Sequence, residues 1–363
     1  MIESLAIVYT KKCNAHCRMC SADAGPSRNE KMGISEVNAY LDMAREVLGL
    51  KKLVLTGGEP LLFFDEIIQI IKHARELGLT TNVVTNAFWA ENRATAISRL
   101  KTLKENGLSF ISFSADKYHQ EYIPITNVRQ AIKAAVDINM PCSVAMVVGE
   151  NDQYNIGEQV KALGEENRFY LLTDLVGLGF EKISYHEMPP QKIGLELLPL
   201  QGYGRGSQIR DDSILRSPEE INAVTCPMVG RVVSIIPGGD IFWCCSANDQ
   251  DQKINDYFKI GNLNMDSLKN MDNYLENDAL CEYLAYQGPK NLLLEIMHEL
   301  DKKSIRKGYT SICDICHEAF RIADKKNLYS LARKQLIMTR ILRAQVHKAS
   351  KDIARQVRQL LRN

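Results

Sequence analysis

The segment KKCNAHCRMC, residues 11–20, places Cys13, Cys17 and Cys20 in the spacing C-x3-C-x2-C. It directly follows the apolar stretch Leu5–Tyr9, a pattern typical of a β-strand. Three thiolates at this spacing suit a four-iron cluster in which one iron has no protein ligand. Ordinary ferredoxins supply four thiolates, so a cluster with three has an open coordination position where a small molecule can bind. The segment therefore predicts a cluster that takes part in chemistry.

A glycine-rich turn, Thr56-Gly57-Gly58-Glu59-Pro60, follows the next apolar strand, Leu53–Leu55. Together with the three cysteines, this turn resembles the radical S-adenosylmethionine (SAM) enzymes. In that family the amino and carboxylate groups of SAM chelate the open iron, and the turn meets the amino group. The resemblance implies that Gly57, Gly58, Glu59 and Pro60 bind SAM, since glycines allow close backbone approach. The alternative is a structural zinc site with His16 as a ligand, but no fourth cysteine lies nearby.

Strand-like apolar segments alternate with helical periodicity through the first half of the chain. The expected strands are Leu5–Thr10, Leu53–Thr56, Thr81–Thr85, Phe110–Ser114, Cys142–Val148 and Ile183–Glu187, and the expected helices are Ser35–Leu48, Phe64–Leu77, Glu91–Asn106, Val128–Ile138 and Gly157–Glu166. This alternation predicts an α/β fold with a parallel sheet and outer helices. By resemblance the fold is the partial (β/α)6 barrel of radical SAM enzymes, a TIM-like barrel whose functional loops follow the C-terminal strand ends.

Polar residues at two further strand ends are candidates for cofactor binding. Asn86 follows the third expected strand, and Ser114 and Asp116 close the fourth. The resemblance implies that such groups bind the ribose hydroxyls and methionyl carboxylate of SAM, and that Met19 contacts adenine. Helix capping or turn formation is the alternative for Asn86 and Asp116. His119 is expected to be a packed or solvent-facing histidine.

A second set of cysteines comprises Cys226, Cys244, Cys313 and Cys316. The turn Pro237-Gly238-Gly239-Asp240 between the apolar stretches Val232–Ile236 and Ile241–Trp243 predicts a β-hairpin that brings Cys226 and Cys244 together. Four thiolates suit zinc. They also resemble the twitch domain, a short form of the SPASM extension of radical SAM enzymes, which carries one auxiliary four-iron cluster. We expect two 4Fe-4S clusters in all, with SAM bound to the first.

Cys245 follows Cys244 directly, and successive side chains on an extended strand point to opposite faces. Its thiol is therefore expected to stay free of the cluster. The Cys-Cys pair resembles radical SAM peptide epimerases, in which the second cysteine returns a hydrogen atom to a substrate radical and so inverts a stereocentre. The alternative is a small buried residue, as we expect for Cys142 and Cys281.

Composition and charge limit the expected partners and cellular location of the protein. The 363 residues carry a net charge of +1, which argues against a strong nucleic-acid binder, and the first residues lack the pattern of an export signal. The ten cysteines are then expected to serve metals or catalysis in the cytoplasm. No apolar run approaches the roughly 18 residues of a membrane-spanning helix, so no membrane partner is expected.

The chain divides into three expected parts. Residues 1–200 form the partial barrel, 201–323 the bridge and twitch-like domain, and 324–363 a basic amphipathic helical tail. The glycine-rich bridge, 196–217, is expected to line the substrate opening. The tail is expected to pack on the barrel, with contact to a leader peptide or nucleic acid as alternatives.

The predicted function is a radical SAM peptide epimerase that converts L-residues into D-residues in a ribosomally synthesised peptide. Its expected partners are a precursor peptide and an electron donor such as flavodoxin or ferredoxin. Alternatives are a twitch-type dehydrogenase, a peptide maturase that forms thioether or carbon-carbon crosslinks, and a zinc-bound nucleic-acid adaptor that uses the basic tail.

Overall fold

The described strands form one sheet. The computed structural model describes residues 2–149, 152–164, 169–174, 193–202, 204–209, 217–221, 225–226, 228–244, 252–266, 270–271, 277–299, 306 and 308–337. The strand order is β10-β9-β8-β1-β2-β3-β4-β5-β7-β6. The strands are β1 Ser4–Thr10, β2 Lys52–Gly57, β3 Thr80–Thr85, β4 Phe110–Ser114, β5 Cys142–Val148, β6 Phe169–Asp174, β7 Ile193–Pro199, β8 Val232–Ile235, β9 Asp240–Phe242 and β10 Lys259–Asn262.

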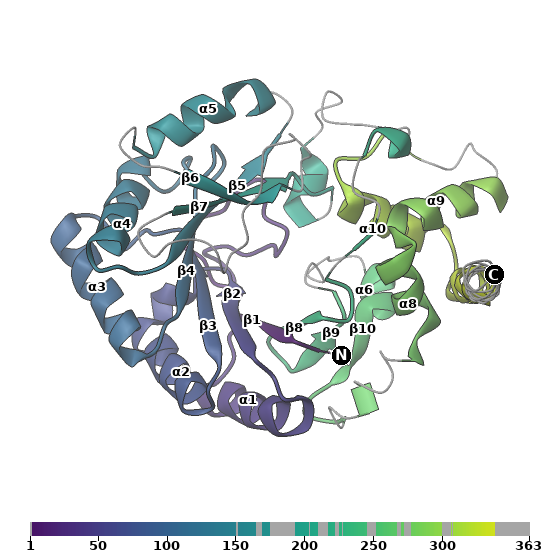
Figure 1. Cartoon of the computed structure of the whole chain (residues 1–363), viewed down its shortest axis with the longest axis horizontal. Helices are drawn as coiled ribbons and strands as arrows, with labels where there is room; N and C mark the ends of the chain where they lie inside the picture. The colour runs from purple at the N-terminus through teal and green to yellow at the C-terminus, as the bar shows by residue number, and fades with distance from the viewer. Residues whose placement is uncertain are drawn as a thin grey trace, which may run out of the picture.

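Strands β1 to β7 pair in parallel, and helices cover their outer side (Figure 1). The covering helices are α1 Ile34–Leu48, α2 Phe64–Glu76, α3 Arg93–Asn106, α4 Ile125–Asp137 and α5 Asp152–Ala162, with a 3-10 turn η1 Pro60–Phe63 ahead of α2. Because parallel strands end at the same edge of a sheet, the segments after β1, β2, β3 and β4 meet at one mouth. The predicted parallel α/β fold is confirmed.

The burial pattern shows which side of the sheet the strand residues face. All seven residues of β1 are buried, since β1 lies mid-sheet between β2 and β8. In β3, Thr81 and Val83 are fully buried toward the helices, whereas Asn82 and Val84 are only half-buried. The inner side of the sheet therefore faces a space that side chains do not fill.

The C-terminal part continues the same sheet. Strand β8 pairs in parallel with β1, from Ser4 opposite Val232 to Ile7 opposite Ile235, and β9 and β10 follow in antiparallel order. The predicted hairpin at residues 236–240 is thereby confirmed. The helices of this part are α6 Gln252–Phe258, α8 Ala279–Tyr286, α9 Gly288–Glu299 and α10 Ile312–Ile322, and α9 packs on α8 and α10. Trp243, Phe258 and Phe320 form an aromatic contact there, with ring centroids 4.7 to 5.9 Å apart.

The sixth strand differs from the expectation. The expected strand Ile183–Glu187 lies outside the described residues, and the place beside β5 is taken by β7, with β6 at the sheet edge. The periodicity missed β7 because IGLELLP mixes small, acidic and apolar residues. Its alternating inner positions, Glu196 and Leu198, face the internal space rather than a packed core.

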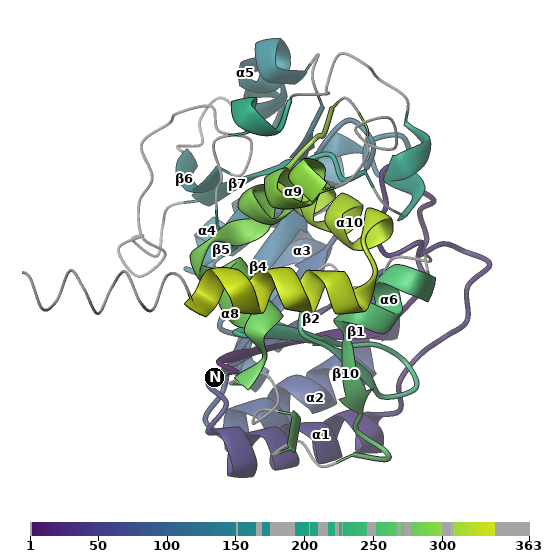
Figure 2. The ribbon, with the colours of Figure 1, turned by 90° about the vertical axis from the view of Figure 1, so that its right-hand side faces the viewer.

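Residues 325–337 of the tail are helical, and residues 338–363 lie outside the described part. Leu328, Leu331 and Leu336 are buried, while Lys325 and Lys326 are exposed. The expected amphipathic helix is therefore present in this stretch. Figure 2 shows this helix beside the C-terminal helices. The hydroxyl of Tyr329 donates to the carboxylate of Asp278, the N-cap of α8, at 2.5 Å.

Candidate active site

The loop that follows β1 presents all three N-terminal cysteines to one cavity of about 670 Å³. The loop is closed by backbone hydrogen bonds, from Cys13 N to Gly25 O at 3.1 Å and from Gly25 N to Lys11 O at 3.1 Å. The amide of Ala15 donates to Cys13 Sγ at 3.4 Å, so the sulfur already accepts one hydrogen bond from its own loop.

Burial weakens the acidity of two of these thiols. It raises the pKa of Cys13 to about 11 and that of Cys17 to about 12, and neighbouring thiols add to the shift. A thiol must lose its proton to bind a metal, so cluster binding at neutral pH has to supply the free energy of deprotonation. Three thiols that line one cavity from one short loop are a donor set whose chemistry fits an iron-sulfur cluster.

The glycine-rich turn lies directly against the cysteine loop. Gly58 N donates to Thr10 O at 2.6 Å, and Glu59 N donates to Lys12 O at 2.9 Å. A Cβ on Gly57, whose φ is 132°, would lie 2.3 Å from Thr10 O, and a Cβ on Gly58 would lie 2.1 Å from Lys12 O. The two glycines are therefore required for backbone-to-backbone packing, while both also line the cavity.

Glu59 lies behind the cavity wall rather than on it. Its side chain is fully buried and accepts hydrogen bonds from Asn86 N at 2.7 Å, Leu61 N at 3.0 Å and Thr85 Oγ1 at 2.9 Å. Burial raises the pKa of this carboxyl to about 7, although these hydrogen bonds oppose the shift. Glu59 joins the end of β2 to the end of β3, and Pro60 begins the 3-10 turn beside it.

Asn86 and Ser114 line the cavity at the ends of β3 and β4, and Met19 lines it from the cysteine loop. The amide of Asn86 donates to Asn14 Oδ1 at 2.9 Å, which ties the end of β3 to the loop. Asp116 does not line the cavity and is 1% exposed.

Asp116 orients a histidine that the sequence reasoning set aside. Its carboxylate accepts the amides of Tyr118, His119 and Val147 at 3.0 to 3.1 Å, and Oδ2 lies 2.9 Å from His119 Nδ1. Burial lowers the pKa of His119, but the Asp116 carboxylate outweighs burial and the net shift is upward. His119 lines the cavity, so its imidazole faces the interior. In the sequence, the position of His119 just past a strand end was the feature that could have identified it as a site residue.

The second cysteine set lines the same cavity. Cys226 and Cys244 lie before and after the β8–β9 hairpin, and Cys313 and Cys316 lie on α10. Burial, then the neighbouring Cys226 and Cys313, raise the pKa of Cys316 well above its usual value. Cys281 and Cys142 are both buried, as expected, and Cys281 lies near Cys226.

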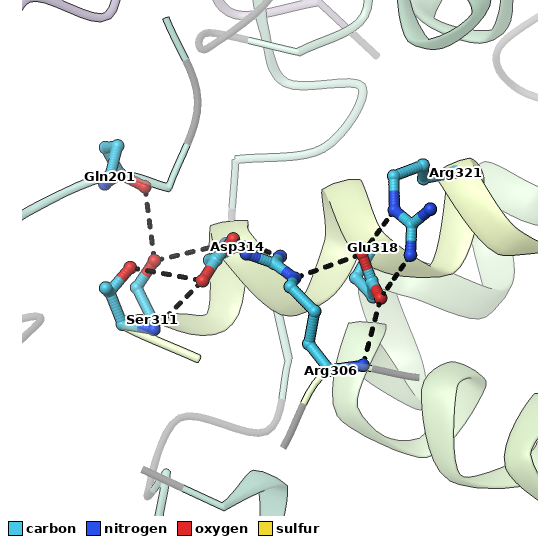
Figure 3. A network of polar contacts seen from close by, with 7 residues as sticks. Gln201, Arg306, Ser311, Asp314, Glu318 and Arg321 are labelled. Carbon is cyan, nitrogen blue, oxygen red and sulfur yellow. Dashed lines mark hydrogen bonds and ion pairs between the residues drawn. The ribbon is translucent and has the colours of Figure 1, made fainter. Parts of the chain in front are cut away.

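A polar network fixes α10 in place (Figure 3). Arg306 donates to Asp314 Oδ1 at 2.6 Å and to Glu318 Oε2 at 3.2 Å, and Arg321 donates to Glu318 Oε2 at 2.7 Å. Both carboxylates are 1% exposed, and two guanidinium groups balance their charge. Ser311, the N-cap of α10, also donates to Gln201 Oε1 at 3.2 Å, so α10 is tied to the segment that follows β7.

All seven predicted ligand cysteines therefore face one cavity. Within the described ranges, no three cysteine, histidine or carboxylate side chains converge to metal-binding distance. Cys245 lies outside the described residues. Arg205 and Glu196 also line the cavity and were missed, since neither belongs to a recognisable motif.

Comparison with known proteins identifies the domain around this loop. Residues 7–158 match the model of the Radical SAM superfamily. This part of the chain is a radical SAM domain. A domain of this superfamily implies SAM and one 4Fe-4S cluster, in agreement with the predicted first cofactor pair.

Relatives of this chain fall into two groups. It is 20% identical over 339 residues to the putative peptide biosynthesis protein YydG of Bacillus subtilis, covering 90% of this chain and 95% of the relative. It is 33% identical over 178 residues to a probable GTP 3',8-cyclase of Methanocaldococcus jannaschii, covering 45% of this chain and 56% of the cyclase. The chain thus spans about half the length of the cyclases it matches.

The fold has a counterpart among solved structures. The native anSMEcpe structure with bound AdoMet superimposes with a TM-score of 0.51 at 14% identity, covering 91% of this chain and 99% of that one. This likeness shows that the two chains share a fold. Among the described helices, none combines the length and apolar character needed to cross a membrane.

Proposed function

We propose that this radical SAM enzyme is a peptide epimerase, which converts L-residues into D-residues in a ribosomally synthesised peptide. The observation that carries the proposal is the shared cavity, because the N-terminal cysteines and the four C-terminal ones line the same space. A substrate in that space would contact the surroundings of both cysteine sets at once.

In this proposal Cys13, Cys17 and Cys20 hold the first cluster, and Met19, Gly57, Gly58, Asn86 and Ser114 contact SAM. All eight line the cavity, which supports the assignment. Glu59, Pro60 and Asp116 act from behind the wall: Glu59 fixes the ends of β2 and β3, and Asp116 orients His119. When bound, the cluster and SAM supply a 5′-deoxyadenosyl radical that removes a Cα hydrogen from the peptide.

Cys226, Cys244, Cys313 and Cys316 hold an auxiliary 4Fe-4S cluster in this proposal. Their donor type fits, and the buried ion-pair network on α10 supports the Cys313–Cys316 end of the set. Zinc in the same four thiolates is the competing assignment, and metal analysis separates the two.

Cys245 is the proposed hydrogen donor, since it directly follows the cavity-lining Cys244. Its S–H bond breaks as a new Cα–H bond forms on the opposite face of the substrate. The sulfur radical left behind takes up one electron and one proton to regenerate the thiol. The electron comes from the donor protein, flavodoxin or ferredoxin.

A precursor peptide is the proposed substrate. The putative peptide biosynthesis protein YydG supports this choice, because the similarity to it extends over 90% of the chain, whereas the similarity to the Methanocaldococcus jannaschii cyclase extends over 45% of it. A cavity of about 670 Å³ lies in the range of roughly 300–1,000 Å³ typical of ligand sites, so it suits one residue of a peptide together with SAM.

The test uses anaerobically reconstituted enzyme, SAM, a reductant and a precursor peptide encoded beside the gene, with the reaction run in heavy water. The expected result is one deuterium at Cα for each inverted residue, measured by mass spectrometry and chiral analysis. Cys245→Ala should still release 5′-deoxyadenosine but should lose deuterium incorporation. Cys142→Ala is the matched control, because that thiol is buried in the core.

Other results would replace the proposal by a named alternative. Loss of two hydrogens per peptide means oxidation or crosslinking, and full turnover of Cys245→Ala means that no thiol hydrogen donor is needed, as in a dehydrogenase. Stoichiometric zinc without iron would remove the radical mechanism altogether.

A further inference from the structure

A short segment after β7 lies between the two cysteine sets. Residues 200–202 and 204–209 follow β7 directly, and the second stretch contains the 3-10 turn η3 Gly204–Gln208. On one side, Gln201 accepts a hydrogen bond from Ser311 of α10, and a Cβ on Gly202 would lie 2.3 Å from Asp314 Oδ1. On the other side, the turn packs on the N-terminal cysteine loop.

The packing on the cysteine loop is close. Arg205 N donates to Cys20 O at 3.0 Å. Gly204 has a φ of 57°, and a Cβ there would lie 2.7 Å from both Cys20 O and Ser21 O. The turn therefore meets the loop backbone to backbone, and glycine is required at this position.

The guanidinium of Arg205 spans the second half of the cysteine loop. Nε donates to Cys17 O at 3.0 Å, one terminal nitrogen donates to Ala24 O at 2.7 Å, and the other lies 2.9 Å from Asp23 Oδ1. The Arg205 side chain is 11% exposed and its partner Asp23 is 21% exposed, so the ion pair is largely shielded from water. One side chain thus engages three points spread over residues 17–24.

Arginine is suited to this arrangement in a way that lysine is not. Its planar fork presents N–H groups in fixed directions, whereas an ammonium is a single charged point on a flexible stem. The first half of the loop is held by the Cys13–Gly25 backbone pair and by the glycine-rich turn. The second half, which carries Cys17 and Cys20, is contacted by Arg205 at Cys17, Asp23 and Ala24.

We propose that Arg205 is a positioning residue that holds Cys17 and Cys20 in the conformation that binds the SAM-ligating cluster. The inference rests on the proposed function, since it concerns the cluster assigned there to the three N-terminal cysteines. It adds that a residue about 190 positions downstream, from the bridge, sets how firmly the cluster is held.

The test compares Arg205→Met and Arg205→Lys with the wild-type enzyme, each full-length and reconstituted under anaerobic conditions. The rate of iron release to a chelator is measured, together with the change in the electron paramagnetic resonance spectrum on adding SAM. That change reports only on the cluster that SAM binds. We expect iron release from the SAM-binding cluster to be about tenfold faster in Arg205→Met, because charge-assisted hydrogen bonds are lost. Arg205→Lys should fall between the two, because it keeps the charge and loses the fork.

Arg306→Met is the matched control. Arg306 also pairs with buried carboxylates beside the cavity, but its partners are on α10. It should leave the SAM-induced spectral change intact, which separates a local effect of Arg205 from general destabilisation. Wild-type behaviour of Arg205→Met, or an equal loss in Arg306→Met, would overturn the inference alone. A wild-type enzyme without any SAM-induced change would overturn the proposed function and the inference with it.

Discussion

Replacing Gly58 with alanine tests the contact between the glycine-rich turn and the cysteine loop. The added Cβ would lie 2.1 Å from Lys12 O and 2.6 Å from Lys12 C, and both are backbone atoms that cannot rotate away. Overpacking of this kind costs about 2 kcal/mol. The backbone shift also lengthens the bonds from Gly58 N to Thr10 O and from Glu59 N to Lys12 O, which adds about 1 kcal/mol.

The expected total is a loss of about 3 kcal/mol in the free energy of unfolding, measured by urea denaturation of the metal-free protein. Because Lys12 precedes Cys13, the variant should also bind less iron on reconstitution. Gly157→Ala is the control: Gly157 lies within α5 with nothing within 4 Å, so alanine there should stabilise the protein by about 1 kcal/mol. A Gly58→Ala protein with wild-type stability and iron content would refute the close packing of turn and loop.

Three further predictions follow from the described contacts. Burial raises the pKa of Glu59 from 4.5 to about 7, so between these two pH values the folded wild type holds a proton that the unfolded chain has released. The free energy of unfolding of the wild type, relative to that of Glu59→Gln, should therefore fall by about 3 kcal/mol as the pH rises from 4.5 to 7. Denaturation at several pH values measures this difference. Asp314→Asn should cost about 2 kcal/mol in urea denaturation, below the usual range for a broken buried pair because Arg306 is 39% exposed, and the exposed Asp324→Asn should cost less. Gly238 and Gly239 both have positive φ, but only at Gly239 would a Cβ meet other side chains, Tyr40 Oη and Asn264 Nδ2, at 2.7 Å each. Gly239→Ala should therefore lower Tm more than Gly238→Ala does. Equal losses of Tm would contradict the docking of the hairpin on α1.

Most of the barrel could be predicted from the sequence because its elements follow simple periodicities. The boundaries of β1, β4 and β5 agree with the expectation to within one residue, as the apolar runs end at turn-forming residues. Strand β7 escaped prediction because Gly194 and Glu196 interrupt its apolar pattern. Both are explained by tertiary structure: Glu196 faces the cavity, and a Cβ on Gly194 would meet the side chain of Leu172 at 2.2 Å.

The candidate site was predictable where its residues form motifs that are continuous in the chain. The three N-terminal cysteines and the glycine-rich turn belong to this class, and the structure brings them together. The role of Glu59 was harder to predict, because whether a carboxylate faces a ligand or the neighbouring strand is decided by packing. Arg205 and His119 were not found for the same reason: their partners, Cys17 and Asp116, became informative only once the chain had folded.

The parallel pairing of β8 with β1 has a consequence for any attempt to divide this enzyme. Strand β1 donates and accepts main-chain hydrogen bonds on both edges, one toward β2 and the other toward β8. A truncated protein that stopped after β7 would leave the β8-facing edge of its most buried strand bare, and such edges recruit strands from other molecules. Excising the barrel alone should therefore yield aggregates, and the two halves are best expressed as a single polypeptide.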